Sequence, residues 1–521
     1  MGIKEIFKNK RKMSIIILIL VGCMLRLIAI DKFPIGLNCD EASSGYEAYA
    51  ILNYGIDRNG NFLPIFLEAW GSGQNVLYSY LMIPFVKLFG LNIITTRLPM
   101  AIIGCVSLII WYLLLKNIKN DENFGLIGLA FLVVCPWHIM KSRWGLESNV
   151  FPDFVLWAVY LLIRYLKTEK KSRLYIASVI LGITGYAYGT AYFFLPIFCV
   201  ILFGYLLYKK EIKIRDVIIC FGIIFIIALP IMLYVLINTF DLQQINLPFM
   251  TIPKLPVNRY EEETTLFSGN IVLNAVENIK NSISLIILQN DKLAWNSIDG
   301  VGMYYIVSVP FLVVGMIASF KKSNFKNKYD NIINIWFISA LLLLFVFKEA
   351  NINRINILIF PLVYYIVEGL YFVFVHDKKV VSIIVIILYF VQFIIFLNSY
   401  INMDINEYWT FADNVNEVIE YTENLNVDKI YFQHAFKEPY IYVLYYGRYN
   451  PHEYIDTVQY FHPNGTFDNV KSFGKYYFYL PDVFNEKDCV YVIAKNNDLE
   501  LDYNEFDVKE FEKYLVLKWR N

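Results

Sequence analysis

The sequence predicts a polytopic α-helical membrane protein with about 11 to 13 transmembrane helices, followed by a small C-terminal extracytoplasmic α/β domain. The chain has 521 residues, of which 57% are hydrophobic and only 18% are charged. Soluble domains usually have about a quarter of their residues charged. The apolar residues form long runs that approach the roughly 20 residues needed to cross a bilayer. Examples are the runs at 14–30, 217–237, 332–347 and 380–397.

The first apolar run is predicted to be an uncleaved transmembrane helix. It is preceded by the basic residues Lys4, Lys8, Lys10, Arg11 and Lys12. At 14–30 it is longer than the apolar core of a signal peptide, and the sequence DKFP follows in place of a small-residue cleavage site. The N-terminus is therefore expected in the cytoplasm of a plasma-membrane protein.

Charge distribution divides the connecting segments into two groups. Segments rich in Lys and Arg are expected in the cytoplasm, and segments poor in Lys outside. We therefore predict a membrane domain over 1–399 and an extracytoplasmic domain over 400–521. The basic residues lie in short loops between apolar runs, so a lipid bilayer is the expected partner and nucleic acid is not. The predicted cytoplasmic segments are 116–119, 167–173, 209–215, 321–328 and 378–379, and the predicted outer segments are 31–75, 136–149 and 239–300.

The topology between residues 76 and 151 stays open. Two apolar segments, 76–89 and 98–115, separate a predicted outer loop from the predicted cytoplasmic Lys116, although an odd number of crossings is needed there. Either one of them lies in the interface or re-enters, or the region 124–151 is split.

Two parts of the predicted outer loops have features of their own. The segment 42–54 is amphipathic, with Ser43, Ser44 and Glu47 among its polar residues, which favours a helix lying in the outer membrane interface. The segment 239–300 is a long loop, and long loops are often functional. We interpret it as a lid.

The region after residue 400 changes to short β-prone runs and two helical segments, which predicts a small α/β domain. The β-prone runs are 430–432, 476–480, 490–494 and 514–517, and the helical segments are 415–425 and 440–446. Of the seven cysteines, five lie in apolar runs. A disulfide between Cys39 and Cys489 is an open alternative, and the spacings do not match a metal-binding motif.

Two adjacent carboxylates, Asp40 and Glu41, follow the first apolar run. A carboxylate held partly out of water can accept a proton from a hydroxyl nucleophile. The alternative is that these acids are solvated or cap the following helix.

Two further polar clusters lie at predicted outer helix junctions. Ionisable groups between membrane spans are costly and tend to mark functional cavities. The planar fork of an Arg suits a phosphate, so Arg354 and Lys348 could hold an anionic lipid headgroup. Interfacial anchoring and snorkelling are the alternatives. The clusters contain His138, Lys141, Ser142, Arg143, Trp144, Glu147 and Asn149, and Lys348, Glu349, Asn351, Asn353, Arg354 and Asn356.

An ordered set of short motifs resembles a known family. These are GLNCDEASSGY at 36–46, GIDRNG at 55–60, LFG at 88–90, RLP at 97–99, PWH at 136–138 and SRWGLE at 142–147. Together they resemble bacterial GT-C glycosyltransferases, in the branch of the protein O-mannosyltransferases and the lipid A aminoarabinose transferase. The resemblance covers about residues 10–375. It does not extend to the C-terminal domain, and the extra loop domain of eukaryotic protein mannosyltransferases is not found.

The resemblance implies a polyprenyl-phosphate-sugar donor and chemistry on the outer face. The family's first outer acid corresponds to Asp40, with Glu41 beside it, and its second acid corresponds to Glu147, although that acid is often Asp. Asp153 is a weaker match. We expect the donor phosphate at Arg143, Arg354 and Lys348, and substrate contacts at His138, Asn353 and Tyr46. A divalent cation, Mg or Mn, could lie between Asp40 and Glu147.

The resulting hypothesis is inverting transfer of a sugar from a polyprenyl-phosphate donor to an extracytoplasmic acceptor, which could be a protein, a cell-envelope polysaccharide or a lipid. A transporter or flippase of lipid-linked sugars is a second interpretation, and it requires polar groups near the bilayer midplane. The segment 182–192, with three Tyr and three Gly, is the mid-span set that could serve it. A non-catalytic membrane scaffold is the third.

Overall fold

The computed structural model describes residues 3–70, 73–256, 271–293, 295–323, 327–347, 351–376, 379–403, 411–434, 437–462 and 470–520. The contacts divide the chain into two compact units. The helical unit comprises Met1–Ile28, Met100–Met232 and Arg259–Asn402, and the mixed unit comprises Ala29–Pro99, Leu233–Asn258 and Met403–Asn521. The first predicted outer loop therefore folds with the C-terminal region.

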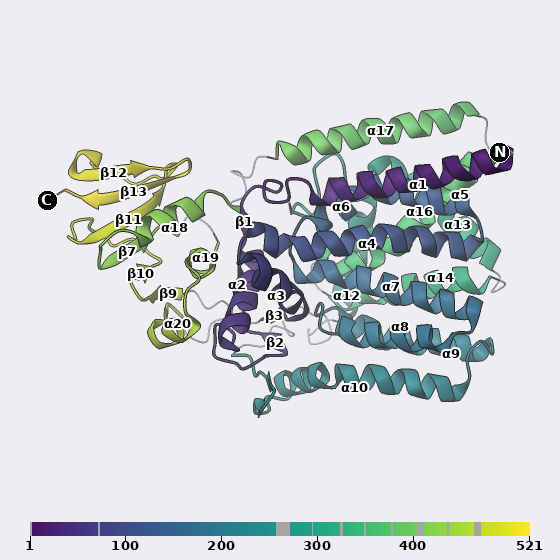
Figure 1. Ribbon diagram of the computed structural model, residues 1–521, viewed down its shortest axis with the longest axis horizontal. Coiled ribbons are helices and arrows are strands. Elements are labelled where there is room, and N and C mark those ends of the chain that lie inside the picture. The colour runs from purple at the N-terminus through teal and green to yellow at the C-terminus, as the bar shows by residue number, and fades with distance from the viewer. Residues whose placement is uncertain are drawn as a thin grey trace. The chain divides into compact units, whose positions relative to one another are not determined.

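The helical unit is built from long helices that run roughly parallel to one another (Figure 1). Two of them, α4 and α10, continue into the mixed unit. The α-helices of this unit, long and short, are α1 (Ile3–Leu27), α4 (Ile93–Lys119), α5 (Glu122–Val134), α6 (Pro136–Ser142), α7 (Glu147–Thr168), α8 (Lys171–Thr184), α9 (Ala191–Tyr208), α10 (Ile214–Thr239), α12 (Ile271–Leu288), α13 (Val309–Ser323), α14 (Lys328–Leu341), α15 (Ile352–Ile355), α16 (Ile359–His376) and α17 (Lys379–Ile401).

The predicted class, a polytopic α-helical membrane protein, is confirmed. Among the described residues, seven helices are long and apolar enough to cross a membrane, or eight if the bent pair α5–α6 forms one span. The predicted count of about 11 to 13 is higher. The described residues also contain shorter apolar helices, Leu77–Phe89 and Ile306–Lys321, which are too short to meet the same length criterion. The protein is thus a multi-pass membrane protein.

A short helix and a bend lie in the region between residues 76 and 151, whose topology was left open. Helix α3 (Leu77–Phe89) has 13 residues and is about 20 Å long, less than the roughly 30 Å of a bilayer core. Helix α4, with 27 residues, is long enough to cross. The region 124–151 is also divided, since α5 and α6 meet at an angle of 60°.

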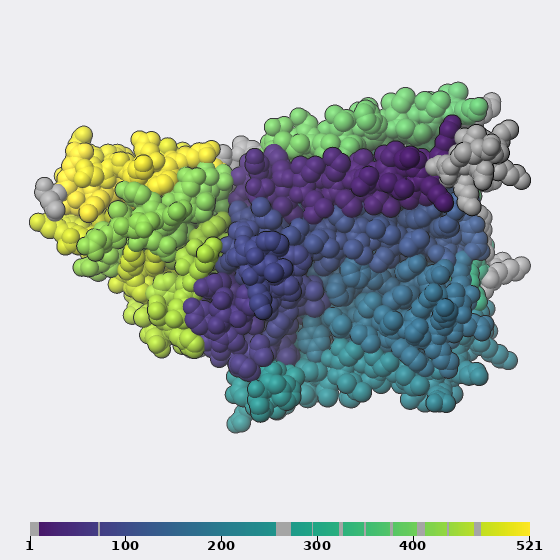
Figure 2. Space-filling view, viewed as in Figure 1, coloured from purple at the N-terminus to yellow at the C-terminus, as the bar shows by residue number. Residues whose placement is uncertain are grey.

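Glycines allow some helices of this unit to approach closely. A Cβ at Gly315 of α13 would overlap the backbone carbonyl of Tyr365, and one at Gly369 of α16 would overlap that of Phe311. Small residues at such crossings bring two backbones together inside a membrane. Gly22 likewise places α1 against Leu108 of α4, and Figure 2 shows α1 and α4 packed side by side.

The mixed unit contains a seven-stranded sheet with the strand order β12-β13-β11-β7-β10-β9-β8. The central strands β11, β7 and β10 are parallel, and the outer pairs are antiparallel. Every residue of β11 is buried, as expected for a central strand. The strands are β7 (Lys429–Phe432), β8 (Gln459–Tyr460), β9 (Val470–Phe473), β10 (Tyr476–Tyr477), β11 (Cys489–Ala494), β12 (Phe506–Glu510) and β13 (Tyr514–Trp519).

The α/β character predicted for the C-terminal region is confirmed. The four predicted β-prone runs correspond to β7, β10, β11 and β13, and the two helical segments to α18 (Val415–Glu423) and α19 (Pro439–Gly447). Strands β8, β9 and β12 and helix α20 (Pro451–Thr457) were not predicted. Both Cys39 and Cys489 are free and buried, so the disulfide alternative is wrong.

The remaining elements of the mixed unit hold the first predicted outer loop and helix α2. Strand β1 pairs with β6 of the C-terminal region, and β2 and β4 pair with β3 and β5. Helix α2 is enclosed by protein: Ser43, Ser44 and Glu47 are all fully buried. Ser43 and Glu47 of this face bind Arg58 within the unit, and the expectation that α2 lies in the membrane interface stays a prediction. The bounds are β1 (Leu37–Asn38), α2 (Cys39–Tyr54), β2 (Phe66–Leu67), β3 (Gln74–Asn75), β4 (Ile245–Leu247), β5 (Met250–Ile252) and β6 (Phe411–Ala412).

Candidate active site

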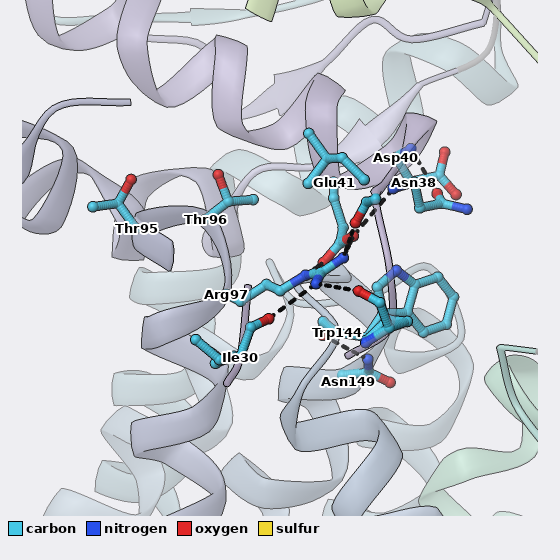
Figure 3. Close-up of polar contacts among 12 residues, drawn as sticks. Ile30, Asn38, Asp40, Glu41, Thr95, Thr96, Arg97, Trp144 and Asn149 are labelled. Atoms are coloured by element: carbon cyan, nitrogen blue, oxygen red, sulfur yellow. Dashed lines mark hydrogen bonds and ion pairs between the residues drawn. The ribbon is translucent and has the colours of Figure 1, made fainter. Parts of the chain in front are cut away.

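The two adjacent carboxylates lie in the first turn of α2 and have different surroundings (Figure 3). The Oδ1 atom of Asn38 accepts a hydrogen bond from the backbone N–H of Asp40 at 2.8 Å. The backbone N–H of Asn38 donates to Oε2 of Glu41 at 3.2 Å, which completes a capping box. The alternative of a helix cap is thus confirmed for Glu41.

Glu41 is also held in a buried ion pair. Arg97 of α4 donates from Nε to Oε1 at 2.8 Å and from Nη2 to Oε2 at 2.9 Å. Both side chains are fully buried. The guanidinium of Arg97 also donates to the carbonyls of Ile30, Pro34 and Gly36, at 3.0, 2.8 and 2.6 Å. Glu41 therefore fixes the start of α2 to α4, which favours a structural function for this acid.

Asp40 is half-buried, unlike its neighbour. Its Oδ1 accepts a hydrogen bond from the indole Nε1 of Trp70 at 3.0 Å, and its backbone carbonyl accepts one from Gln74 at 3.3 Å. The carboxylate is thus oriented by an indole donor and is partly accessible. Such a group suits a general base, which must be both positioned and reachable.

A second buried ion pair lies along α2, where Arg58 donates from Nε to Oε1 of Glu47 at 2.6 Å. The backbone N–H of Arg58 donates to Oε2 of the same carboxylate at 3.1 Å. Burial raises the pKa of Glu47 to about 7, although Arg58 opposes the shift.

Tyr46, a predicted substrate contact, is fully buried in the mixed unit. Its hydroxyl donates to the backbone carbonyl of Tyr449 at 2.8 Å. This contact gives Tyr46 a packing function between α2 and the C-terminal region. Burial raises the pKa of its phenol well above the usual value.

In the helical unit, four ionisable residues form a buried chain. Arg26 donates from Nε to Nδ1 of His138 at 3.1 Å, so Nδ1 acts as an acceptor. Nε2 of His138 lies 3.9 Å from Oδ1 of Asp153, and the other oxygen of Asp153 binds Lys141. Of the predicted cluster, the structure thus brings His138 and Lys141 together with Asp153.

Glu147 and Arg143 lie at helix ends of the same unit. Glu147 is the first residue of α7, where the helix dipole favours a carboxylate. Nη1 of Arg143 donates to the carbonyls of Leu25 and Ile28 at 3.0 and 2.9 Å, at the C-terminal end of α1. Both residues are mostly buried, at 8% and 4% exposure.

Residues from both polar clusters, the one around His138 to Asn149 and the one around Asn351 to Asn356, line a small cavity. Within it, the Nδ2 group of Asn356 donates to the carbonyl of Ser148 at 2.6 Å. Asp291 fixes one wall, because its Oδ2 accepts from Asn296 at 2.7 Å and from the backbone N–H of Ile352 at 2.9 Å. The lining residues are Trp137, Met140, Lys141, Trp144, Asn149, Trp295, Asn296, Ile352, Asn353 and Asn356.

Arg354 is half-buried on α15, whose first turn is capped by the side chain of Asn351. Asn353, on the same short helix, lines the cavity. Lys348 and Glu349 lie outside the described residues, as does 257–270 of the predicted lid. Among the residues that are described, no three His, Cys, Asp or Glu side chains gather into a metal site. A cation between Asp40 and Glu147 stays a prediction.

Comparison with known proteins gives a family match over part of the chain and fold matches over most of it. The profile of the dolichyl-phosphate-mannose-protein mannosyltransferases matches residues 74–237. An uncharacterised protein of Aquifex aeolicus is 26% identical over 132 residues. The match covers 25% of this chain and 26% of that protein, so only about a quarter of the relative's length is spanned.

Two solved structures share the architecture at low sequence identity. ArnT from Cupriavidus metallidurans, bound to undecaprenyl phosphate, has a TM-score of 0.55 with 10% identity, covering 96% of this chain and 97% of that one. The Archaeoglobus fulgidus oligosaccharyltransferase has a TM-score of 0.52 with 11% identity, covering 84% and 63%. The chain has the GT-C glycosyltransferase fold.

Four residues of this GT-C chain were not assigned to the site from the sequence: Arg26, Arg58, Trp70 and Arg97. Arg26 and Arg97 lie within apolar helices, and an ionisable group in such a place implies a partner. That signal was available in the sequence. The contact between Trp70 and Asp40 spans 30 residues and had no sequence signal.

Proposed function

We propose that the protein is a membrane glycosyltransferase that moves a sugar from a polyprenyl-phosphate-linked donor to an acceptor on the extracytoplasmic side. The mannosyltransferase profile match supports a glycosyltransferase. The fold shared with undecaprenyl-phosphate-bound ArnT over nearly the whole length supports a lipid-linked donor.

The observation that carries the assignment of a base is the contrast between the two adjacent acids. Glu41 is fully buried and paired with Arg97, whereas Asp40 is half-buried and oriented by Trp70. The partial exposure of Asp40 supports it, rather than Glu41, as the acid that meets the acceptor. It would remove the proton from the acceptor hydroxyl as the new bond forms.

The chemistry is a displacement at the anomeric carbon. The acceptor oxygen forms a bond to that carbon while the bond to the phosphate oxygen breaks, and the configuration inverts. The acceptor proton goes to Asp40, and the bonding electrons leave with the lipid phosphate. Arg354 and Arg143 would stabilise the departing charge, because guanidinium groups suit phosphate oxygens.

The predicted substrate contacts are refined by the geometry. Asn353 lines the cavity and remains our choice for a sugar contact. Tyr46 and His138 are engaged by Tyr449 and Arg26, so we assign them structural functions. Glu147, at the start of α7, remains the second acid of the proposal.

The experiment uses the purified protein in proteoliposomes with undecaprenyl-phosphate-linked radiolabelled hexoses and a cell-envelope extract as acceptor. The wild type is expected to transfer label and release undecaprenyl phosphate, and Asp40→Asn to lose at least about 1,000-fold of that activity. Asp31→Asn is the matched control, because Asp31 is an exposed acid of the same loop. Full activity of Asp40→Asn would remove Asp40 as the base.

The same vesicles separate the rival functions. A flippase would move intact lipid-linked sugar across the bilayer without releasing undecaprenyl phosphate. The expectation that 182–192 is a mid-span polar set is wrong, because residues 185–190 form the turn between α8 and α9. The hydroxyl of Tyr186 in this turn donates to the carbonyl of Ile227 at 2.7 Å, so these tyrosines do not support a transport interpretation. Movement without transfer would overturn the proposal.

A further inference from the structure

Trp70 lies between the proposed base and the C-terminal region. Its Nε1 donates to Oδ1 of Asp40 at 3.0 Å. Its ring makes a T-shaped contact with Tyr440 of α19, with centroids 6.0 Å apart and planes at 74°. All three residues belong to the mixed unit.

The indole is held on a second side by a cation. The guanidinium carbon of Arg58 lies 5.5 Å from the centroid of the Trp70 ring. Trp70 is only 9% exposed. Because the ring is mostly buried between these neighbours, its contact with Asp40 is better explained by positioning than by stacking on a substrate.

Arg58 is itself fixed by three partners. It forms the ion pair with Glu47, donates from Nη2 to the hydroxyl of Ser43, and donates from Nη1 to the hydroxyl of Tyr440 at 3.3 Å. Each partner is at most 5% exposed. The indole of Trp70 therefore rests on a rigid polar layer that joins α2 to α19.

Further contacts attach α19 to the segment that carries Asp40. The hydroxyl of Tyr442 donates to the carbonyl of Leu37 at 3.0 Å. Further along α2, the hydroxyl of Tyr46 donates to the carbonyl of Tyr449, just after α19, at 2.8 Å. Strands β1 and β6 pair just before α2 begins. The C-terminal region thus contacts the Asp40 helix at its start and along its side.

We infer that Trp70 is a positioning residue for Asp40, and that α19 of the C-terminal region holds Trp70 in place through Tyr440 and Arg58. The inference rests on the proposed function. It makes the C-terminal region part of the machinery for turnover, in place of a separate module that only recruits partners.

The test separates turnover from binding in the full-length protein, with the undecaprenyl-phosphate-linked hexose that the wild type uses. Trp70→Phe keeps an aromatic ring and removes the N–H donor. We expect kcat to fall about tenfold or more, since hydrogen bonds to charged groups are worth about that factor, while the KM for the donor changes less than about twofold. Tyr440→Phe, which removes only the hydroxyl that binds Arg58, should lower kcat by a smaller factor.

Trp111→Phe is the matched control. It removes an indole N–H that donates to the carbonyl of Gly128 at 3.1 Å in the helical unit. It should lower thermal stability without changing kcat per folded protein. An equal fall of kcat in both Trp variants would show a general effect of lost packing and would overturn the inference.

A double-mutant cycle shows whether Trp70 acts through Asp40. In an Asp40→Glu background, whose carboxylate is displaced from the indole, Trp70→Phe should lower kcat less than in the wild type. Equal effects in both backgrounds would contradict a positioning function. Activity that survives in Asp40→Asn would instead refute the proposed base, whatever the Trp70 variants do.

Discussion

Arg97 binds both carboxylate oxygens of Glu41, at 2.8 and 2.9 Å, in a fully buried pair. Asp40 directly precedes Glu41 in the chain. The arrangement separates two acids that look equivalent in sequence: one fixes the helix and the other is partly accessible. A buried pair of this kind is sensitive to the loss of one partner, because the remaining charge is left without compensation.

Glu41→Gln is expected to lower the free energy of unfolding by about 3–5 kcal/mol, because Arg97 then keeps a buried charge without its anion. Arg97→Lys should also destabilise, since an ammonium group cannot reproduce the paired bonds and the three carbonyl contacts. Thermal unfolding of the purified protein in detergent measures both effects.

The control for this pair is Glu122→Gln. Glu122 binds Lys116 at 2.6 Å, but the two side chains are 46% and 38% exposed. Exposed pairs contribute about 0–1 kcal/mol, so little change is expected. Similar losses in Glu122→Gln and Glu41→Gln would show that burial of the Arg97 pair is not what matters.

Stability should depend on pH through Glu47. Burial raises the pKa of this carboxyl to about 7 in the folded protein, whereas an exposed Glu titrates near pH ~4.3. Between these values the folded state holds a proton that the unfolded state releases. The contribution to stability is therefore fully present below about pH 4.3 and is lost as the pH rises through about 7.

Glu47→Gln isolates this effect from the other carboxylates of the chain. Near pH 5 the variant and the wild type should unfold at similar temperatures, because both carry a neutral side chain. As the pH rises through about 7, the difference in stability between the two should shift in favour of the variant, because only the wild type then carries a buried carboxylate charge. A wild type that gains stability relative to Glu47→Gln as the pH rises would show that Arg58 lowers the pKa of Glu47 below its usual range.

The sequence was sufficient for the fold class and for the central strands of the C-terminal domain. Long apolar runs and short β-prone runs such as 490–494 carry strong local signals. Strand β12 (FDVKE) alternates polar and apolar residues at the edge of the sheet and has a weaker signal. Its pairing with β13 fixes it as a strand, and that information is not local.

The candidate site shows the same limit. Asp40 could be selected from its position after the first helix, but its orientation by Trp70 depends on a long-range contact. The pattern of α2 was correctly found to contain polar residues, yet it suggested a membrane surface. Ser43 and Glu47 are interior groups that bind Arg58, and Arg58 in turn binds Tyr440 of the distant α19. Periodicity cannot distinguish these environments.

Close packing between α2 and α19 predicts the effect of a glycine substitution. A Cβ at Gly45 would lie 2.7 Å from Cε2 of Tyr445 and 3.0 Å from Oγ1 of Thr96. Gly45→Ala should destabilise the protein by about 1–3 kcal/mol, as overpacking does. Gly204→Ala on α9, where nothing lies within 4 Å, should be neutral or stabilising through helix propensity. Thermal unfolding of both variants compares them, and an unaffected Gly45→Ala would contradict tight packing here.

Arg354 gives the sharpest test of where the donor phosphate binds. It is half-buried on α15, beside Asn353 of the polar cavity, and a charge-assisted bond to a phosphate is worth about 1.5–3 kcal/mol. Arg354→Ala should therefore raise the KM for an undecaprenyl-phosphate-linked hexose at least about tenfold, and Arg354→Lys should restore part of the affinity, because a point charge replaces the planar fork. Arg173→Ala, in a predicted cytoplasmic segment, should leave that KM unchanged. If the KM of Arg354→Ala for the donor equals that of the wild type, the donor phosphate does not bind Arg354. Arg143 then becomes the residue to test.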